Sequence, residues 1–199
     1  MSDPYNLKDK KITNQAVLKA FSKTTRKLFI PKGFKSFADN DEPLPISEGQ
    51  TISQPSLVAY MTQLLDVNRN HTVLEIGTGS GFQTAILSHL AKHITTVEII
   101  SSLFHKAKIL LLKLGYTNIT CLLADDHQHK SQKFDRIMVT AAAKDIPNKL
   151  IEQLKSPGKM VIPIGKEHQI QILMLIEKDR SGNVNETSSI PVRFVPLKS

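Results

Sequence analysis

Three glycines at alternate positions, Gly77, Gly79 and Gly81, are the residues best suited to build a ligand site. They follow the mainly apolar run 73–76, so the chain should pass from a strand into a tight turn and then into a helix. Glycine lets the backbone turn sharply and approach a ligand, and open α/β sheets bind nucleotides where such strands end. The spacing therefore predicts a nucleotide-binding crevice, with a glycine turn that holds no ligand as the alternative.

The same spacing separates two kinds of nucleotide cofactor. A dinucleotide-binding turn has its third glycine one residue later, where this chain has Phe82. NAD is therefore disfavoured as the ligand of this turn.

Acidic residues at two further strand ends suit a nucleoside. Glu98 ends the second predicted strand, where such folds place a carboxylate on the ribose hydroxyls. Asp125 and Asp126 follow the third predicted strand, where an acid can accept a hydrogen bond from an adenine amino group. An ordinary exposed strand-end acid is the alternative for Glu98, and a solvated turn is the alternative for the two aspartates.

Alternating strands and helices must position these residues. The predicted strands are 72–76, 94–99, 119–123, 135–140 and 160–164, and the predicted helices are 57–67, 83–91, 103–114 and 147–154. Two further strands, 170–177 and 189–195, have only a turn-rich segment between them and should pair antiparallel. The pattern predicts an α/β, Rossmann-like, doubly wound and mostly parallel seven-stranded sheet with an antiparallel C-terminal strand pair.

The N-terminal part has a different character. Apolar residues at helical spacing (Ile12, Val17, Leu18 and Phe21) predict a helical cap, followed by a Pro- and Asp-rich irregular loop. The length of 199 residues favours a single domain over 1–199. Within it we expect a cap and substrate loop over 1–56 and a cofactor-binding core over 57–199.

The composition is that of a globular protein. The 26 Lys and Arg residues against 18 Asp and Glu residues give a net charge of +8, but they are scattered, which favours a solvated basic surface over a nucleic-acid site. The lone Cys121 lies in an apolar run and should be a buried small residue, not a catalytic thiol. No signal peptide and no membrane-length apolar run is visible, so a cytoplasmic protein is expected.

Two motifs carry a resemblance to a known family. The segment 73–81 resembles the first motif of class I S-adenosylmethionine-dependent methyltransferases. Far more specific is 49–55, Gly-Gln-Thr-Ile-Ser-Gln-Pro, which resembles the segment that distinguishes protein-L-isoaspartate (D-aspartate) O-methyltransferases. Further similarity runs from about Phe29 onward, through 43–46, 139–143, 146–147, 154–158, 161–165 and 191–197.

The resemblance implies a repair reaction. A methyl group passes from S-adenosylmethionine to the free carboxylate of an L-isoaspartyl residue, and S-adenosylhomocysteine is the other product. The ester collapses to a succinimide, whose hydrolysis returns part of the material to normal aspartate. The carboxylate is already ionised at neutral pH and needs no general base, so positioning should supply most of the catalysis. The implied partners are isoaspartyl proteins and peptides, with no nucleic acid or membrane partner, and size suggests a monomer.

The resemblance also implies roles for individual residues. Ser53 is expected to be the active-site serine, which orients the acceptor by hydrogen bonding; a loop serine that caps the following helix is the alternative. A hydrolase is disfavoured, because Ser53 is not in a Gly-x-Ser-x-Gly turn. The expected substrate-binding residues are Thr51, Ser53, Ala141, Ala142, Val192 and Phe194. The expected cofactor-binding residues are Ile52, Gln54, Glu75, Gly77, Thr78, Gly79, Ser80, Gly81, Glu98, Ile99, Asp125, Asp126 and Thr140.

The chain departs from the family pattern at a few positions. Ala124 and Asp126 stand where the family usually has glycine, and Asp39 and Ser47 replace an aromatic residue and a glycine in the expected substrate loop. These changes keep two rivals open: a carboxyl methyltransferase for one dedicated partner, and a silent protein that binds S-adenosylmethionine. RNA methylation is disfavoured, because no Asn-Pro-Pro-Tyr-like or paired cysteine motif is present. No metal site is predicted, since the His127 and His129 pair lies in a polar loop without a supporting ligand set.

Overall fold

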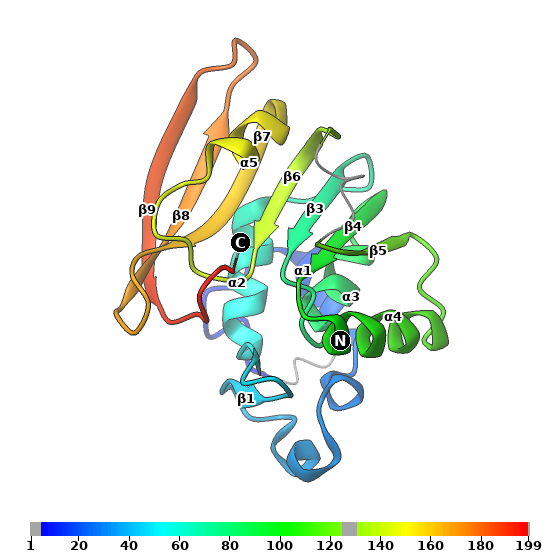
Figure 1. Cartoon of the computed structure of the whole chain (residues 1–199). Coiled ribbons are helices and arrows are strands. Elements are labelled where there is room, and N and C mark those ends of the chain that lie inside the picture. Colours follow the sequence, from blue (N-terminus) through cyan, green and yellow to red (C-terminus); the bar gives the residue numbers. More distant parts are fainter. Residues whose placement is uncertain (1–4, 125–130, 199) are drawn as a thin grey trace.

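The computed structural model describes residues 5–124 and 131–198. A seven-stranded sheet with the order β5-β4-β3-β6-β7-β8-β9 forms its centre (Figure 1). Its strands are β3 (Thr72–Ile76), β4 (His93–Glu98), β5 (Ile119–Leu123), β6 (Phe134–Val139), β7 (Leu154–Ile164), β8 (Gln171–Lys178) and β9 (Val184–Val192). Strands β3 to β7 are parallel, whereas β8 is antiparallel to both neighbours. The mostly parallel sheet with an antiparallel C-terminal pair, predicted from sequence, is confirmed.

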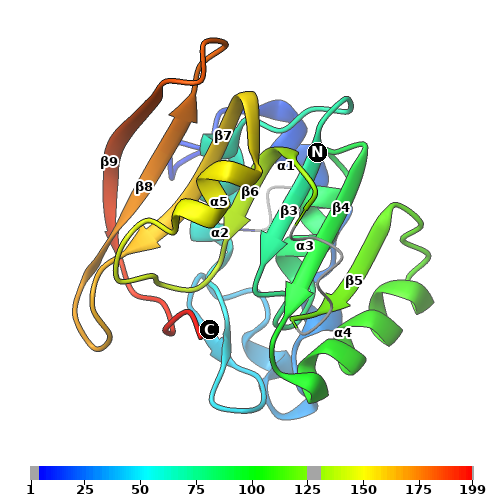
Figure 2. The same ribbon diagram turned by 45° about the horizontal axis from the view of Figure 1, so that its top comes forward.

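Helices cover both faces of the sheet. They are α1 (Gln15–Ser22), α2 (Pro55–Leu65), α3 (Phe82–Ser88), α4 (Ser101–Lys113) and α5 (Asn148–Gln153). In Figure 2, α5 lies in front of the sheet, whereas α1, α2 and α3 lie behind it. Side chains alternate along β3, so Val73 packs with Met61 of α2 and Leu74 packs with Leu150 of α5. Within the two described segments, no helix has the length and apolarity that a membrane crossing requires.

The strand order reverses at β3. The chain continues from β3 to β4 on one side, whereas β6 lies against β3 on the other side. Crossovers that leave in opposite directions open a crevice at the carboxyl ends of the strands. This topology puts the glycine turn, which follows β3, at the mouth of that crevice.

The predicted N-terminal helical cap is present and is packed on α3. Helix α1 is capped by Asn14, whose side-chain oxygen accepts hydrogen bonds from the amides of Ala16 and Val17 at 2.9 and 3.3 Å. Its buried face includes Phe21, whose ring meets that of Phe82 edge-on with a centroid distance of 5.9 Å. The cap is therefore continuous with the core on this side of the sheet.

The segment expected to be an irregular loop is more ordered than its sequence indicates. It forms two 3₁₀ helices, η1 (Arg26–Phe29) and η2 (Lys32–Phe37), and a ribbon of β1 (Leu44–Pro45) and β2 (Thr51–Ile52). The ribbon lies beyond the carboxyl ends of the parallel strands (Figure 1). It therefore covers the crevice that the strand order creates.

Two strand boundaries predicted from sequence were wrong. Strand β7 begins at Leu154, not at 160, and includes Pro157 and Gly158, two residues that usually indicate a break. Strand β9 spans Val184–Val192, not 189–195, and most of its side chains are exposed. An edge strand with a solvated surface has no apolar alternation, so its pattern could not be recognised.

Candidate functional site

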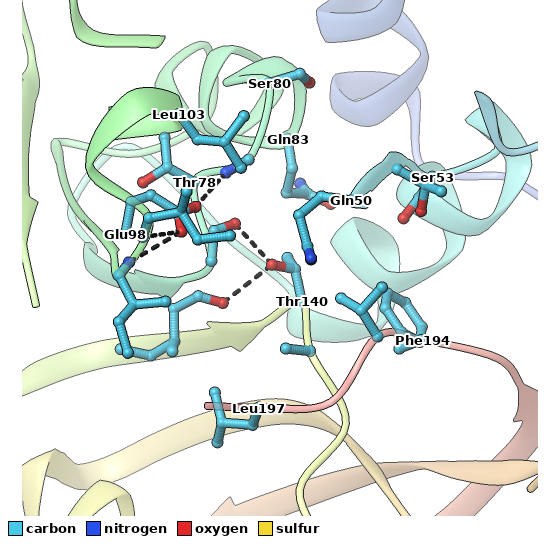
Figure 3. Close-up of a pocket in the computed structure, with 18 of the residues that line it drawn as sticks. Gln50, Ser53, Thr78, Ser80, Gln83, Glu98, Leu103, Thr140, Phe194 and Leu197 are labelled. Atoms are coloured by element: carbon cyan, nitrogen blue, oxygen red, sulfur yellow. Dashed lines mark hydrogen bonds between the residues drawn. The ribbon is translucent and has the colours of Figure 1, made fainter. Parts of the chain in front are cut away.

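A cavity opens at the carboxyl ends of β3, β4 and β6 (Figure 3). It is bounded by the glycine turn, the end of β4, the start of the segment after β6 and the loop that contains Ser53. Figure 3 shows Gln50 extending into it between Thr140 and Ser53, with Glu98 on the opposite side. The predicted site residues that line it are Thr51, Ile52, Ser53, Gly77, Thr78, Gly79, Ser80, Glu98, Ile99, Thr140, Ala141 and Phe194.

The glycine turn has a backbone conformation that few other residues adopt. Gly77, Gly79 and Gly81 have φ values of 99°, 53° and 86°. The amide of Gly77 donates to the Val97 carbonyl at 2.8 Å, which attaches the turn to β4. The Thr140 hydroxyl lies 2.7 Å from the Gly77 carbonyl oxygen, which attaches it to the end of β6. The turn is thus held from both neighbouring strands.

Glu98 organises the same turn from β4. One carboxylate oxygen accepts the amide of Gly79 at 2.8 Å, and the other accepts the amides of Ile99 and Ile100, each at 2.9 Å. The side chain is 5% exposed and borders the cavity. A carboxylate has about four acceptor positions, so one position is left for a ligand hydroxyl.

Ser53 lies where two cavities meet. A second, shallower groove is bounded by Pro43, Leu57 and the segment from Ile190 to Val195. The residues that line both spaces are Thr51, Ser53, Thr140, Phe194 and Val195. The Ser53 carbonyl accepts a hydrogen bond from Arg26, whereas its hydroxyl makes no hydrogen bond within the described part of the chain. The hydroxyl is therefore available to a molecule that reaches across the junction.

A family model for the protein-L-isoaspartate(D-aspartate) O-methyltransferases matches residues 5–199. The chain belongs to this family.

Individual relatives of the methyltransferase family match most of the chain. Protein-L-isoaspartate O-methyltransferase 2 of Polaromonas sp. (strain JS666) is 46% identical over 186 residues, which is 92% of this chain and 88% of the relative. Protein-L-isoaspartate O-methyltransferase of Jannaschia sp. (strain CCS1) is 45% identical over 195 residues, with 97% and 87% coverage. These identities extend across both the cap and the sheet.

Solved structures of the family share the fold. One protein-L-isoaspartate O-methyltransferase superposes with a TM-score of 0.86 at 25% identity, over 97% of this chain and 64% of the other. A Plasmodium falciparum protein described as the same enzyme, in complex with S-adenosyl-L-homocysteine, has a TM-score of 0.80 at 24% identity, over 97% and 95% of the two chains. The match includes the N-terminal cap, since nearly the whole chain is covered.

Several residues that the family resemblance indicated do not line the first cavity. Gln54 and Val192 border the groove and not the first cavity. Gly81 precedes α3 and packs against Leu111, and Ala142 forms a bridge with the C-terminal segment. Asp125, Asp126, His127 and His129 fall outside the described residues, and the described residues contain no group of side chains arranged to hold a metal ion.

Glu75 also lies away from the cavity, although the resemblance indicated a cofactor contact. It is completely buried, and one carboxylate oxygen accepts the hydroxyls of Thr84 at 2.5 Å and Thr96 at 2.6 Å. Thr96 is in turn hydrogen-bonded to the Thr78 hydroxyl at 2.7 Å. Glu75 therefore supports the glycine turn from behind, because its position on β3 directs it toward α3.

Burial raises the pKa of the Glu75 carboxyl to about 7, and the hydrogen bonds from Thr84 and Thr96 partly oppose this rise. The folded protein therefore binds this proton more tightly than the unfolded chain. The stability that the proton contributes is complete below the unfolded pKa and is lost as pH rises through about 7.

Glu75→Gln should reveal this dependence, because glutamine does not titrate. From pH 5 to pH 8 the free energy of unfolding of the wild type should fall relative to the variant, by up to about 3 kcal/mol. Urea unfolding at the two pH values measures this difference, and all other titrating groups cancel. A difference that is the same at both pH values contradicts the prediction.

Some cavity residues were not predicted from sequence. Gln83 and Leu103 line it from α3 and α4. The C-terminal segment returns to the end of β6, where the Ala142 amide donates to Val195 and the Leu197 amide donates to Ala142, each at 2.8 Å. The family resemblance had indicated Phe194 of this segment as a site residue, but the return of Val195 to Leu197 along the end of β6 depends on contacts between distant segments.

Cys121 has surroundings that suit an unreactive thiol. It is partly buried on β5, and burial raises the pKa of its thiol to about 11. The reactive thiolate is therefore scarce at neutral pH.

Proposed function

We propose that this chain transfers the methyl group of S-adenosylmethionine to the free carboxylate of L-isoaspartyl residues in proteins and peptides, and so serves protein repair. The observation that supports this most directly is the junction of two cavities at Ser53. One cavity has the residues of a nucleoside site. The other is a groove open to the surface and lined by residues from several segments. A donor and a polypeptide acceptor can therefore meet at one point.

The first cavity fits the cofactor. Gly77 and Gly79 line the cavity without side chains and so allow close approach of a ligand, and Glu98 retains an acceptor position suited to ribose. Ile99 and Leu103 provide an apolar wall for a base. Ala124, where the family usually has glycine, has no positive φ and lines the cavity, so alanine is accommodated without backbone strain.

S-adenosylmethionine, when bound, supplies a methyl group made electrophilic by a positively charged sulfur. The chain's own part is to hold the acceptor carboxylate in line with that methyl group. In this proposal the Ser53 hydroxyl donates to one carboxylate oxygen, and the other carboxylate oxygen forms the new bond with carbon. The carbon–sulfur electron pair stays on sulfur, so the step moves no proton and needs no general base.

The assignment of individual residues and of the protein's setting belongs to the same proposal. We assign Ser53 the catalytic role and assign substrate contacts to Thr51, Ala141, Ala142, Val192 and Phe194. Cofactor contacts are assigned to the remaining predicted residues except Glu75 and Gly81, which act through the turn, and Gln54, which borders the groove. The enzyme is a monomer of one domain over 1–199 and works in the cytoplasm without a nucleic-acid partner. A single cysteine and scattered lysines support this setting.

The test is methyl transfer from labelled S-adenosylmethionine to a synthetic isoaspartyl peptide, beside its normal aspartyl twin. Label should enter only the isoaspartyl peptide, and the product should be base-labile. Ser53→Ala should lower kcat/KM about 10- to 100-fold, because a hydrogen bond to a charged group contributes about 1.5–3 kcal/mol. Ser22→Ala, an exposed serine on α1 far from both cavities, is the matched control and should leave kcat/KM unchanged.

Two results would contradict the proposal. Failure to label either peptide, with S-adenosylhomocysteine binding intact by calorimetry, favours a dedicated substrate or a silent binding protein. Equal labelling of both peptides shows that the groove does not recognise the isoaspartyl linkage.

A further inference from the structure

Arg26 is a charged residue in an unusual place. It begins η1 in the cap and is only 1% exposed, the bulkiest of the fully buried side chains. Removing a guanidinium from water is costly unless its donors are directed at acceptors. Both terminal nitrogens of Arg26 are so directed, whereas the buried Nε has no hydrogen-bond partner. The acceptors that Arg26 reaches therefore indicate what it does.

Those acceptors are backbone carbonyls from two separate segments. One terminal nitrogen donates to Ala38 and Asn40, each at 3.1 Å. The other donates to Glu42 at 2.8 Å and to Ser53 at 3.2 Å. The planar guanidinium has its donors in a fixed geometry, so it sets the position of the loop 38–42 relative to Ser53.

The same loop is attached to Ser53's helix at a second point. One carboxylate oxygen of Asp41 accepts the amide of Ser56, in the first turn of α2, at 2.8 Å, and the other pairs with Lys10. Ser53 thus lies between the β1–β2 ribbon and α2, with its carbonyl bound by Arg26. The next residue after the loop, Pro43, lines the groove beside Ser53.

We propose that Arg26 is a positioning residue for methyl transfer, which fixes the Ser53 backbone and the adjoining loop so that the Ser53 hydroxyl faces the acceptor carboxylate. This inference rests on the proposed function. Arg26 lines neither the first cavity nor the groove, and none of its bonds reaches the glycine turn, Glu98 or Thr140. In-line transfer is sensitive to small displacements of the acceptor, so loosening Ser53 should slow the reaction and spare the cofactor.

Arg26→Lys tests this, because lysine keeps the charge but cannot reach four carbonyls in two directions. We expect kcat/KM for the isoaspartyl peptide to fall about 30-fold, the fold-change of losing about two hydrogen bonds. The dissociation constant of S-adenosylhomocysteine should change less than threefold. Arg26→Gln, which is uncharged and easier to bury, replaces the lysine variant if that variant does not fold.

Arg136→Lys is the matched control. Arg136 is also largely buried, at 9% exposed, and donates to the backbone carbonyls of Asp66 and Asp135 at 3.1 and 2.9 Å. It lies at the opposite end of the sheet from Ser53. Of its two partners, Asp66 precedes β3 and Asp135 lies at the start of β6. This variant should lose thermal stability without a specific loss of kcat/KM.

A double-mutant cycle with Ser53→Ala separates positioning from general loosening. If Arg26 acts through Ser53, adding Arg26→Lys to Ser53→Ala should cost much less than it costs alone. If the two substitutions lowered kcat/KM by independent factors that multiply in the double variant, the inference would be overturned. A parallel loss of cofactor affinity would overturn it as well.

Amide hydrogen exchange gives a readout that needs no substrate and so separates this inference from the proposed function. In Arg26→Lys, residues 38–54 should exchange at least tenfold faster, whereas the strand and turn over 72–81 should be unchanged. Unchanged exchange in 38–54 would overturn the positioning role even in a protein that methylates nothing. If the wild-type protein methylated no peptide but Arg26→Lys still showed the expected faster exchange in 38–54, only the proposed function would be overturned.

Discussion

Gly77→Ala should weaken binding of S-adenosylmethionine and S-adenosylhomocysteine about 100-fold or more. Gly77 has a φ of 99°, a conformation that costs a non-glycine residue about 1–3 kcal/mol. An added Cβ would also collide with the Thr140 hydroxyl oxygen, which cannot withdraw without losing its contacts with the Ile76 and Gly77 carbonyls. Both penalties fall on the turn that borders the cofactor cavity. Calorimetric titration with S-adenosylhomocysteine measures the loss, since about 1.4 kcal/mol corresponds to a factor of ten.

Gly115→Ala is the control for backbone strain alone. Gly115 follows α4, has a φ of 79°, and has no atom within 4 Å of an added Cβ. It should lower stability by a similar backbone penalty and leave cofactor affinity unchanged. Adding Thr140→Ala to Gly77→Ala removes the colliding oxygen and should restore part of the affinity. Wild-type affinity in Gly77→Ala would show that the turn can rearrange and that the glycine is dispensable.

Glu98→Gln should lower cofactor affinity about 10- to 100-fold and destabilise the fold. The carboxylate accepts three backbone amides with its two oxygens, so a carboxamide must direct its own N–H donors at Gly79 or at the Ile99 and Ile100 pair. Losing bonds to a charged acceptor and leaving a buried donor without a partner costs about 1.5–3 kcal/mol. The acceptor position assigned to ribose is affected by the same change.

Glu177→Gln makes the same chemical change at an exposed ion pair. Glu177 pairs with Lys159 at 3.2 Å near the opposite end of the sheet, and its side chain is 40% exposed. Calorimetry should show unchanged cofactor affinity, and thermal unfolding should show little effect. If Glu98→Gln lowered stability but not affinity, the carboxylate would be a support for the turn and not part of the cofactor site.

Local sequence patterns predicted the elements that carry the cofactor site. The strand ending at Ile76, the glycine turn and the acid at the end of β4 are each specified within a few neighbouring residues. Strand periodicity and positive-φ glycine are local properties, and parallel strands bring their carboxyl ends to one edge. The same logic failed for β9, where exposed polar residues hide the strand.

Tertiary packing decided the positions of charged side chains that local sequence patterns could not predict. The family resemblance indicated Glu75 as a cofactor ligand, but the alternation of side chains along β3 buries it against α3. Nothing in the sequence distinguished Arg26 from the other scattered basic residues. Its burial comes from carbonyls 12 to 27 positions further along the chain, which converge on it only after the loop folds over the cavity.

The sequence by itself therefore determined the family, the sheet and the glycine turn. The sheet and the turn depend on residues adjacent in the chain, and the family was indicated by the short motif 49–55. Only the tertiary structure decided which charged groups are buried, where the C-terminal segment returns, and how the groove joins the cofactor cavity at Ser53. These features depend on contacts between segments that are far apart in the chain. The packing of the whole fold selects such contacts, and they produce no periodic pattern in the sequence.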